Sequence, residues 1–243
     1  MAHMVHDARR SVLITGAGRG FGRELVRAFA GRGWRVLALV RSRAAAAAVA
    51  AEHPGVCVPI VADVTGAALH PAVSGALVSA GGVLDVLVNN AGSGGAGRTL
   101  QTLDPDEVRR LLEVHCLGAL RCAQAALPFL GRSRRGLIVN VTSRLGSLGR
   151  TAAGEYTALQ ASYGYRIAKA AQNMLTLCMS QDLPGHGVAV CGVHPGRLLT
   201  TNAAPDADTS PGEAAGRLAQ WVERAGPEVN GRYFDNDVGE MEW

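Results

Sequence analysis

Short apolar runs alternate with longer segments of helical periodicity along most of the chain. The apolar runs cover residues 11–15, 35–40, 56–61, 84–89, 136–142, 188–193 and 232–234. They are rich in Val, Leu and Ile and end at glycine or polar residues, as buried β-strands do. Helices are expected over residues 20–30, 67–79, 104–130 and 212–224, in an alanine-rich segment after the second strand, and around residues 165–169.

The alternation of strands and helices determines the expected architecture. Parallel strands need crossover connections, and these are right-handed. We therefore expect an α/β fold with a doubly wound, mainly parallel sheet of seven strands and helices on both faces. The chain has no repeat and no linker, so residues 11–243 are expected to form one domain after an N-terminal tail of residues 1–10, of which residues 1–3 look like an expression scar.

Composition supports a single packed core and argues against several other classes of protein. Of the 243 residues, 48% are hydrophobic, which suffices for one buried core. The net charge is +4, but the arginines are scattered, and their densest group, at residues 132–135, falls where a helix should end. No nucleic-acid binding is therefore expected. No apolar run is long enough to cross a membrane, so no membrane association is expected either.

The cysteines indicate a reducing compartment. The chain has five, at positions 57, 116, 122, 178 and 191, and none shows the spacing of zinc ligands. Most of them fall in apolar strand or helix runs, so we expect free thiols, no metal site and a cytoplasmic location. The dominance of arginine over lysine suggests a GC-rich bacterial source.

A glycine-rich segment follows the first predicted strand and opens the first predicted helix. It contains Gly16, Gly18, Arg19, Gly20, Phe21 and Gly22. Glycines at such a turn let backbone N–H groups approach a pyrophosphate at the N-terminus of a helix. The strand–loop–helix context therefore predicts a dinucleotide-binding loop, although the spacing differs from G-x-G-x-x-G.

The residues after the second predicted strand indicate which dinucleotide binds. An acidic residue at this point would bind a ribose 2′-hydroxyl and select NAD. The chain instead has Arg41, and Arg19 lies in the glycine loop. Guanidinium groups can neutralise a 2′-phosphate, so we expect NADP(H) rather than NAD(H). The alternative is that Arg41 is only a surface charge at the end of a strand.

Lys169 is the only lysine in the chain, and it lies four residues after Tyr165. Positions i and i+4 share one face of a helix. A cation about 4 Å from a phenol supplies about 4 kcal/mol at an effective dielectric of about 20, which would bring the phenol pKa from about 10 to about 7. An isolated pair of this kind is usually a solvated helix face. If the pair is instead part of an active site, Tyr165 is predicted to donate and accept a proton near neutral pH. Tyr156 and Tyr163 have no lysine at this offset.

Together with motifs at other strand ends, these features resemble the short-chain dehydrogenase/reductase superfamily, and within it the C-factor and sniffer-type carbonyl reductases. The resemblance runs from Val12 to Trp243 and implies a Rossmann-type fold. It rests on the glycine loop, Asp63-Val64, Asn89-Asn90-Ala91-Gly92, Ser143, Tyr165-Arg-Ile-Ala-Lys169, His194-Pro195-Gly196 and the ending from Asn230 to Asp237.

The resemblance implies a role for each matching position. The catalytic residues would be Ser143, which binds the substrate carbonyl, Tyr165, which protonates it, and Lys169, which also holds the nicotinamide ribose. Besides the glycine loop and Arg41, the cofactor contacts would come from Asp63, Val64, Asn90, Ala91, Gly92, Tyr165, Lys169, Pro195, Gly196, Leu198 and Thr200.

The chain departs from the family pattern at two places. His115 stands where the family commonly has an asparagine that supports a proton relay. Imidazole can also bind water and relay a proton, and the alternative is a histidine packed in a helix. Residues 150–162 lengthen the segment between Ser143 and Tyr165, and we expect them to form a loop on the substrate side that also affects contacts between subunits.

The expected activity is NADPH-dependent reduction of a ketone or aldehyde, reversible as alcohol oxidation. Residues 92–97, 144–162 and 200–211 would line a mainly apolar pocket for a medium-sized ketone, and residues 200–211 read as a mobile loop. A homodimer or homotetramer is possible for such a protein. The alternatives are an NADPH-binding signalling protein with little turnover, and a non-redox reaction on the same scaffold.

Overall fold

The computed structural model describes residues 9–159, 161–200, 206–237 and 239–243. Most of the expected N-terminal tail and the centre of the expected mobile loop lie outside these residues. Leu198, just before this loop, forms a bridge with Thr209 inside it.

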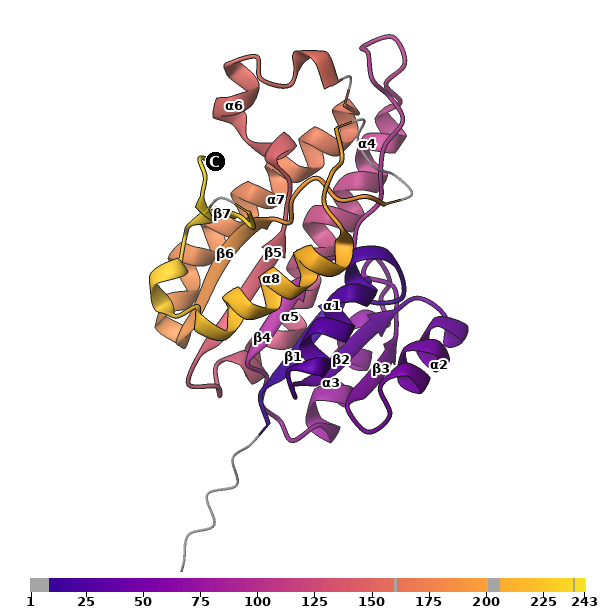
Figure 1. The fold of residues 1–243 in the computed structure, drawn as a ribbon, viewed down its shortest axis with the longest axis vertical. Helices are drawn as coiled ribbons and strands as arrows, with labels where there is room; N and C mark the ends of the chain where they lie inside the picture. The colour runs from indigo at the N-terminus through magenta and orange to yellow at the C-terminus, as the bar shows by residue number, and fades with distance from the viewer. Residues whose placement is uncertain (1–8, 160, 201–205, 238) are drawn as a thin grey trace, which may run out of the picture.

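Within the described residues, eight strands form one sheet in the order β3-β2-β1-β4-β5-β6-β7-β8 (Figure 1). The strands are β1 (Ser11–Thr15), β2 (Arg35–Val40), β3 (Cys57–Val61), β4 (Val86–Asn89), β5 (Gly136–Val141), β6 (Val188–His194), β7 (Tyr233–Asp235) and β8 (Gly239–Glu240). The first seven are parallel, and β8 pairs antiparallel with β7. The expected count of seven was therefore one too low, because a two-residue strand has no periodicity to detect.

Helices cover both faces of the sheet, which confirms the predicted doubly wound fold. The helices are α1 (Gly20–Gly31), α2 (Arg43–Glu52), α3 (Leu69–Ser79), α4 (Pro105–Leu112), α5 (Gly118–Leu130), α6 (Leu148–Ala152), α7 (Tyr163–Asp182) and α8 (Pro211–Arg224). Shorter helical turns span Arg144–Gly146, Thr157–Leu159, Leu183–His186 and Pro227–Val229. None of the helices in the described residues is long and apolar enough to cross a membrane.

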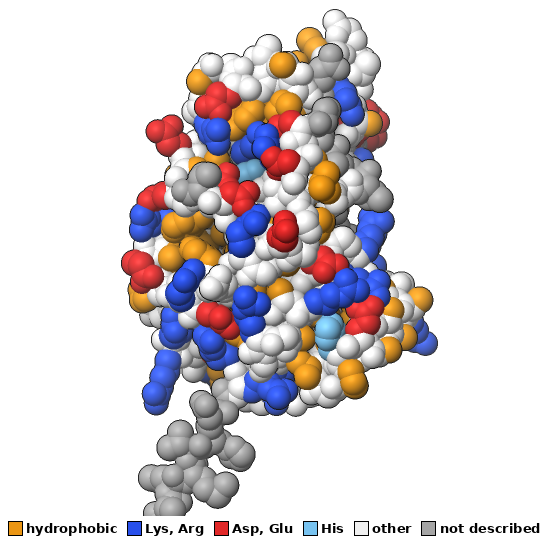
Figure 2. Space-filling view, viewed as in Figure 1, with side chains coloured by type: hydrophobic (Ala, Val, Ile, Leu, Met, Phe, Trp, Pro, Cys, Tyr) orange, Lys and Arg blue, Asp and Glu red, His pale blue; other side chains and the backbone are white. Residues whose placement is uncertain are grey.

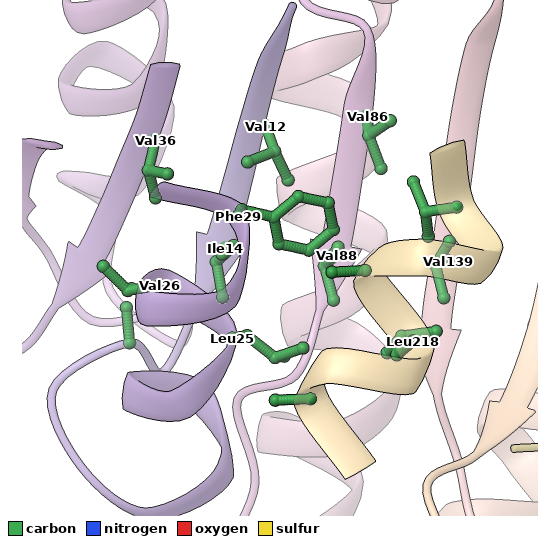
Figure 3. Close-up of a cluster of buried hydrophobic side chains, with 14 of the residues drawn as sticks. Val12, Ile14, Leu25, Val26, Phe29, Val36, Val86, Val88, Val139 and Leu218 are labelled. Atoms are coloured by element: carbon green, nitrogen blue, oxygen red, sulfur yellow. The ribbon is translucent and has the colours of Figure 1, made fainter. Parts of the chain in front are cut away.

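The two faces of the sheet carry two separate apolar cores. Side chains alternate along each strand, so Val12 and Ile14 face one core while Leu13 faces the other. Phe29 from α1 and Leu218 from α8 pack on the first face, as Figure 3 shows. The second face packs against α3, α5 and α7. Both faces are buried, which explains why the strands are nearly continuous apolar runs.

The strand order places a crevice at the centre of one sheet edge. β1 pairs with β2 on one side and with β4 on the other, so the crossovers that follow these strands run in opposite directions. In open parallel sheets, ligands bind at this point, beyond the carboxyl ends of the strands. Four predicted site segments lie along this edge, because each stands at the carboxyl end of a parallel strand. They are the glycine loop after β1, residues 89–92 at the end of β4, Ser143 after β5 and residues 194–196 at the end of β6.

The long helix predicted over residues 104–130 is interrupted. Asp104 caps α4 by accepting a hydrogen bond from the Asp106 N–H at 2.9 Å, with a proline at the first turn, as predicted. Residues Glu113–Leu117 then form a π-helical turn before α5 begins. Apolar periodicity cannot reveal the wider turn, because the residues on both sides of it are helical. Such turns are common at functional sites, and this one contains His115.

Charged side chains of both signs are interspersed on the face that Figure 2 displays. Many of the arginines are paired with carboxylates, such as Arg23 with Glu52 and Arg232 with Glu240. The cysteines are free thiols, as expected, and Cys57, Cys122 and Cys191 are buried. The described residues contain no cluster of three or more His, Cys, Asp or Glu side chains that could hold a metal ion.

Candidate active site

The glycine loop is shaped by close backbone approaches that only glycine allows. A Cβ at Gly22 would lie 2.2 Å from the carbonyl oxygen of Gly16. Gly16 has a φ of 66°, and a Cβ there would lie 2.8 Å from Cα of Ala91. Helix α1 starts at Gly20 with neither a side-chain cap nor an acidic residue in its first turn. The first N–H groups of α1 are therefore suited to the pyrophosphate of a dinucleotide.

Thr15 connects the glycine loop to the segment after β4. Its hydroxyl accepts hydrogen bonds from the N–H groups of Asn90 (3.0 Å) and Ala91 (2.9 Å). The side-chain amide of Asn90 donates to the Thr15 carbonyl at 2.9 Å. The structure thus brings predicted cofactor residues from β1 and β4 together, and Asn90 stabilises the loop. Gly92 packs against His115, since a Cβ at this glycine would lie 2.6 Å from Cε1 of the imidazole.

Arg41 and Asp63 lie near each other beyond the ends of β2 and β3. The Thr65 N–H, 2.9 Å from Asp63 Oδ1, lowers the pKa of Asp63, and the charge of Arg41 contributes further in the same direction. Arg41 and Arg19 are both exposed. Val64 is buried, and a Cβ at Gly118 would lie 2.9 Å from Cγ2 of this valine. The arrangement offers a carboxylate and an exposed guanidinium at the place predicted for the adenosine end of the cofactor.

Ser143 and Tyr165 come together from different elements. Ser143 follows β5 and is 6% exposed, and its hydroxyl accepts a hydrogen bond from the Leu145 N–H at 3.2 Å. Helix α7 starts beside it, with Ser162 as the cap that accepts from the Tyr165 N–H at 3.2 Å. A Cβ at Gly146 would lie 2.8 Å from the backbone of Lys169, so α7 docks closely on the turn after Ser143.

Lys169 is buried on α7, with 4% of its surface exposed. Its ammonium donates to the Val141 carbonyl at 2.8 Å and to Gln172 Oε1 at 2.9 Å. Nζ lies 5.8 Å from the centroid of the Tyr165 ring. Burial lowers the pKa of Lys169 to about 7, so its charge is readily lost near neutral pH.

The expectation that Lys169 brings the pKa of Tyr165 to about 7 is wrong for this geometry. Burial raises the pKa of Tyr165 above its ordinary value, and the neighbouring hydroxyl of Ser143 opposes the rise. Lys169 directs its ammonium at Val141 and Gln172 instead of the phenol, and burial lowers its own pKa to about 7. The i, i+4 spacing correctly predicted a shared face but not the direction of each side chain. Tyr165 is therefore protonated at neutral pH.

His115 lies against Tyr165, with ring centroids 5.4 Å apart and ring planes at 88°. It is 2% exposed, and Nε2 is 2.8 Å from the carbonyl oxygen of Ser93, while Nδ1 is buried without a partner in the described residues. Burial lowers the pKa of His115 to about 3, and the charge of Lys169 acts in the same direction. The imidazole is thus neutral, and it is both a packed residue and a neighbour of the candidate acid.

The segment after β6 forms a turn beside the first core. Gly196 has a φ of 97°, and a Cβ there would lie 3.1 Å from an oxygen of Asp237. Leu198 packs against the core that includes α1 and α8, and the Leu199 N–H donates to the Thr209 carbonyl at 2.9 Å. The segment after β6 therefore lies at the same edge of the sheet as the glycine loop and Ser143. No contact in the described residues assigns a cofactor to the predicted residues Pro195, Gly196, Leu198 and Thr200.

The expected substrate-side segment carries more charge than an apolar pocket requires. Arg144 pairs with Asp206, and Arg150 pairs with Glu155 at 2.7 Å. Each guanidinium carbon lies 5.7 Å from the ring centroid of Tyr156, which is buried between them. Tyr156 is thus a packing residue of this segment, consistent with the choice of Tyr165 as the candidate acid. The charges of Arg144 and Arg150 are thus each paired with a carboxylate.

Sequence reasoning missed Glu107, which holds the glycine-rich substrate segment. Its carboxylate accepts hydrogen bonds from the N–H groups of Ala96 (3.0 Å) and Gly97 (3.2 Å) and from the hydroxyl of Ser162 (3.2 Å). The Ala96 N–H is the main cause that lowers the pKa of Glu107. Glu107 therefore joins α4 to the start of the helix that carries Tyr165. Its sequence position, on a polar helix face, carries no signal for this role.

A buried polar network behind Lys169 was also missed. Asn89 donates to Asn140 Oδ1 at 2.9 Å, and Asn140 donates to the Thr176 hydroxyl at 2.8 Å. Thr176 donates to the carbonyl of Gln172, whose side chain accepts from Lys169. The asparagines inside two apolar strands were a usable signal, because buried polar groups are almost always paired.

A doubly wound α/β fold that carries a glycine loop and a Ser–Tyr–Lys set along one sheet edge is typical of a dehydrogenase or reductase. The family description "short chain dehydrogenase" matches residues 10–210, and the chain belongs to this family. The predicted resemblance is therefore confirmed. Proteins of this family are oxidoreductases that use nicotinamide cofactors.

Two curated relatives and one solved structure illustrate the similarity. The C-signal of Myxococcus xanthus is 35% identical over 162 residues, covering 67% of this chain and 94% of that protein. The 1-hydroxy-2-glutathionyl-2-methyl-3-butene dehydrogenase of Rhodococcus sp. (strain AD45) is 34% identical over 239 residues, 96% of this chain and 99% of the relative. The NADPH-bound carbonyl reductase from chicken fatty liver superposes with a TM-score of 0.86 at 26% identity, over 97% and 99% of the two chains.

Proposed function

We propose that the protein is an NADPH-dependent reductase of ketones or aldehydes, which also oxidises the corresponding alcohols. The convergence of Ser143, Tyr165 and Lys169 at the carboxyl edge of the sheet carries this proposal. A nicotinamide cofactor would supply the hydride, which is the cofactor's own chemistry. The protein would supply binding, orientation and the proton.

In this proposal, Ser143 and Tyr165 act on the carbonyl oxygen of the substrate. Reduction builds negative charge on that oxygen, and hydroxyl donors aimed at it lower the barrier. The raised pKa of Tyr165 keeps its proton in place at neutral pH, which suits a proton donor in the reductive direction. Lys169, with a pKa of about 7, can hold a ribose hydroxyl and restore the proton, and His115 can bind a water molecule through its unpartnered Nδ1.

The preference for NADPH would come from Arg41 and Arg19. Both guanidinium groups are exposed, and β2 ends without a carboxylate that would repel a 2′-phosphate. Asp63 beside Arg41 fits the adenine side, and Gly16, Gly20 and Gly22 fit the pyrophosphate. The carbonyl reductase from chicken fatty liver, which binds NADPH, supports this choice.

A medium-sized ketone is the proposed substrate, with residues 92–97 and 144–159 as parts of the wall. The paired charges of Arg144 and Asp206 add polar character to a pocket otherwise expected to be apolar. A homodimer or homotetramer, a cytoplasmic location and a bacterial source are further proposals. The apolar residues Ile167 and Met174 are 44% and 57% exposed on one face of α7, which supports self-association.

The first experiment measures NADPH consumption over a panel of ketones and aldehydes. The wild type should reduce several of them, and Tyr165→Phe should lose at least about 100-fold in kcat/KM, because general acid catalysis contributes about 10²–10⁴. Tyr163→Phe is the matched control, since Tyr163 is 40% exposed on the same helix and should change nothing. Equal activity of the wild type and Tyr165→Phe would refute the proposed mechanism.

A second candidate function is that of an NADPH-binding signalling protein with little turnover. The similarity to the C-signal of Myxococcus xanthus favours this alternative. Cofactor binding by fluorescence, together with the carbonyl panel, separates the two functions. Tight NADPH binding without reduction of any carbonyl would support the signalling role, and analysis of products would detect a non-redox reaction on the same scaffold.

A further inference from the structure

Ser143 lies just beyond the point where regular strand pairing ends. The Thr142 N–H still donates to the Val193 carbonyl of β6 at 2.8 Å. The next N–H, that of Ser143, donates to the side-chain hydroxyl of Thr142. The backbone N–H of the candidate catalytic serine is therefore paired with one neighbouring side chain.

The hydroxyl of Thr142 is in turn held by Tyr233. Thr142 Oγ1 donates to Tyr233 Oη at 3.0 Å, and both residues are buried, with 2% and 0% exposed. This contact joins β5 to β7 across the intervening strand β6. It is possible because β6 has Gly192 at the crossing, where a Cβ would lie 3.1 Å from the ring of Tyr233 and 3.2 Å from Cγ2 of Thr142.

The C-terminal segment covers this contact. The ring of Trp243 stacks on that of Tyr233, with centroids 4.9 Å apart and planes at 23°. Trp243 also reaches Gly192, where a Cβ would lie 3.2 Å from its ring. The Met241 N–H donates to the Tyr233 carbonyl at 2.8 Å, so the segment is tied to β7. Tyr233 is thus fully buried, with its ring against Trp243 and Gly192.

We propose that Tyr233 is a positioning residue for the reaction, because its hydroxyl orients Thr142 and Thr142 orients the backbone of Ser143. The inference rests on the proposed function for the role of Ser143, but it adds two residues to which the glycine-loop and Ser–Tyr–Lys motifs assign nothing. Tyr233 keeps its proton, because burial raises its pKa, and a charge on nearby Tyr165 would raise it further. It is therefore a neutral hydrogen-bond partner over the working pH range.

Two substitutions remove one hydroxyl each and preserve shape. Tyr233→Phe keeps the ring that stacks on Trp243, and Thr142→Val keeps a β-branched side chain. Both should lower kcat at least tenfold while the KM for NADPH changes less than twofold. The double variant should be no slower than the slower single variant, since both act through one bond. Thr142→Ser should restore most of the activity.

The pH profile distinguishes positioning from a general packing role. The neighbouring Ser143 hydroxyl lowers the pKa of Tyr165, so a displaced Ser143 should move the rise of alcohol oxidation with pH to more alkaline values. Amide hydrogen exchange of Ser143, measured by NMR, should accelerate at least tenfold in Tyr233→Phe and Thr142→Val. Ser11→Ala is the control, because it removes a buried hydroxyl at the opposite end of the sheet and should leave both readouts unchanged.

The outcomes separate this inference from the proposed function. If the wild type reduces carbonyls but kcat, the pH profile and the exchange of Ser143 stay within twofold in both variants, the positioning role is refuted and the function stands. A lower thermal midpoint of Tyr233→Phe with unchanged kcat would likewise show that Tyr233 acts only in packing. If the wild type reduces no carbonyl, the function fails, and the exchange rate of Ser143 still decides whether Tyr233 controls its backbone.

Discussion

The glycine loop and the candidate catalytic cluster lie on the same sheet edge, but they are built in opposite ways. The loop depends on backbone shape, since Gly16 and Gly22 allow contacts that any Cβ would block. The cluster depends on side chains that arrive from distant elements, with Ser143 buried after β5, Lys169 buried on α7 and Tyr165 partly buried on the same helix. A local motif can therefore specify the first site, whereas the second exists only once the whole sheet has formed.

The two regions also differ in how far their titratable groups are buried. Near the glycine loop, Arg19 and Arg41 are exposed to solvent. In the cluster, burial shifts the pKa values of Tyr165, Lys169 and His115 away from their ordinary values. Substitutions in the cluster should therefore change chemistry and pH dependence, and substitutions near the loop should change cofactor binding.

Lys169→Arg tests the cluster most severely. A guanidinium cannot lose its charge and is wider than an ammonium, whereas Lys169 fits between Val141 and Gln172 with a pKa of about 7. We expect kcat/KM to fall at least about 100-fold, within the range of general acid–base catalysis. Arg166→Lys on the same helix is the control and should stay within about twofold of the wild type. Full activity of Lys169→Arg would remove the argument for this residue.

Gly22→Ala tests the loop with a single methyl group. The new Cβ would lie 2.2 Å from the Gly16 carbonyl oxygen, so the backbone must move. We expect a loss of about 1–3 kcal/mol in the free energy of unfolding, and NADPH affinity at least about tenfold weaker. Gly75→Ala has no atom within 4 Å of its new Cβ and lies inside α3, so it should stabilise the fold by about 0.5–1 kcal/mol. Denaturant unfolding and cofactor titration measure both variants.

His115→Asn tests the pH dependence of the cluster. The folded pKa of His115 is about 3, against about 6.5 when unfolded, so the unfolded chain binds more protons between these values. The wild type should therefore lose stability as pH falls from about 6.5, by about 2 kcal/mol at pH 5 from this residue. His115→Asn should not show this part of the decrease in the free energy of unfolding, which urea unfolding at pH 7 and pH 5 measures. Parallel losses in both proteins would contradict a buried neutral imidazole.

Arg41→Ala gives the smallest and most selective expected change. Loss of one charge-assisted contact should weaken NADPH binding about tenfold, equal to about 1.4 kcal/mol, and leave NADH binding unchanged. Arg132→Ala, an exposed arginine that contacts the Gly82 carbonyl, should affect neither cofactor. Titration of both cofactors into each variant provides the measurement. Equal weakening of NADPH and NADH would refute the phosphate assignment.

The sequence was sufficient for features whose cause is local. Strand runs such as residues 35–40, the cap at Asp104 and the glycine loop follow from periodicity, capping and turn chemistry, and the structure has them where expected. Residues such as Thr142 and Tyr233 could not be linked from the sequence, because 91 positions separate them and β6 lies between their strands. The direction of the pKa shift at Tyr165 likewise depends on burial, which spacing along a helix does not reveal.

The presence of a single lysine has a practical consequence for chemical modification. Reagents that acylate ε-amines have only Lys169 as a target, and its pKa of about 7 leaves a large share of the amine reactive in neutral solution. Because this amine is 4% exposed, it reacts only when the site opens to solvent. The rate at which Lys169 is acylated therefore reports the opening of the active site, and a bound cofactor should slow the reaction.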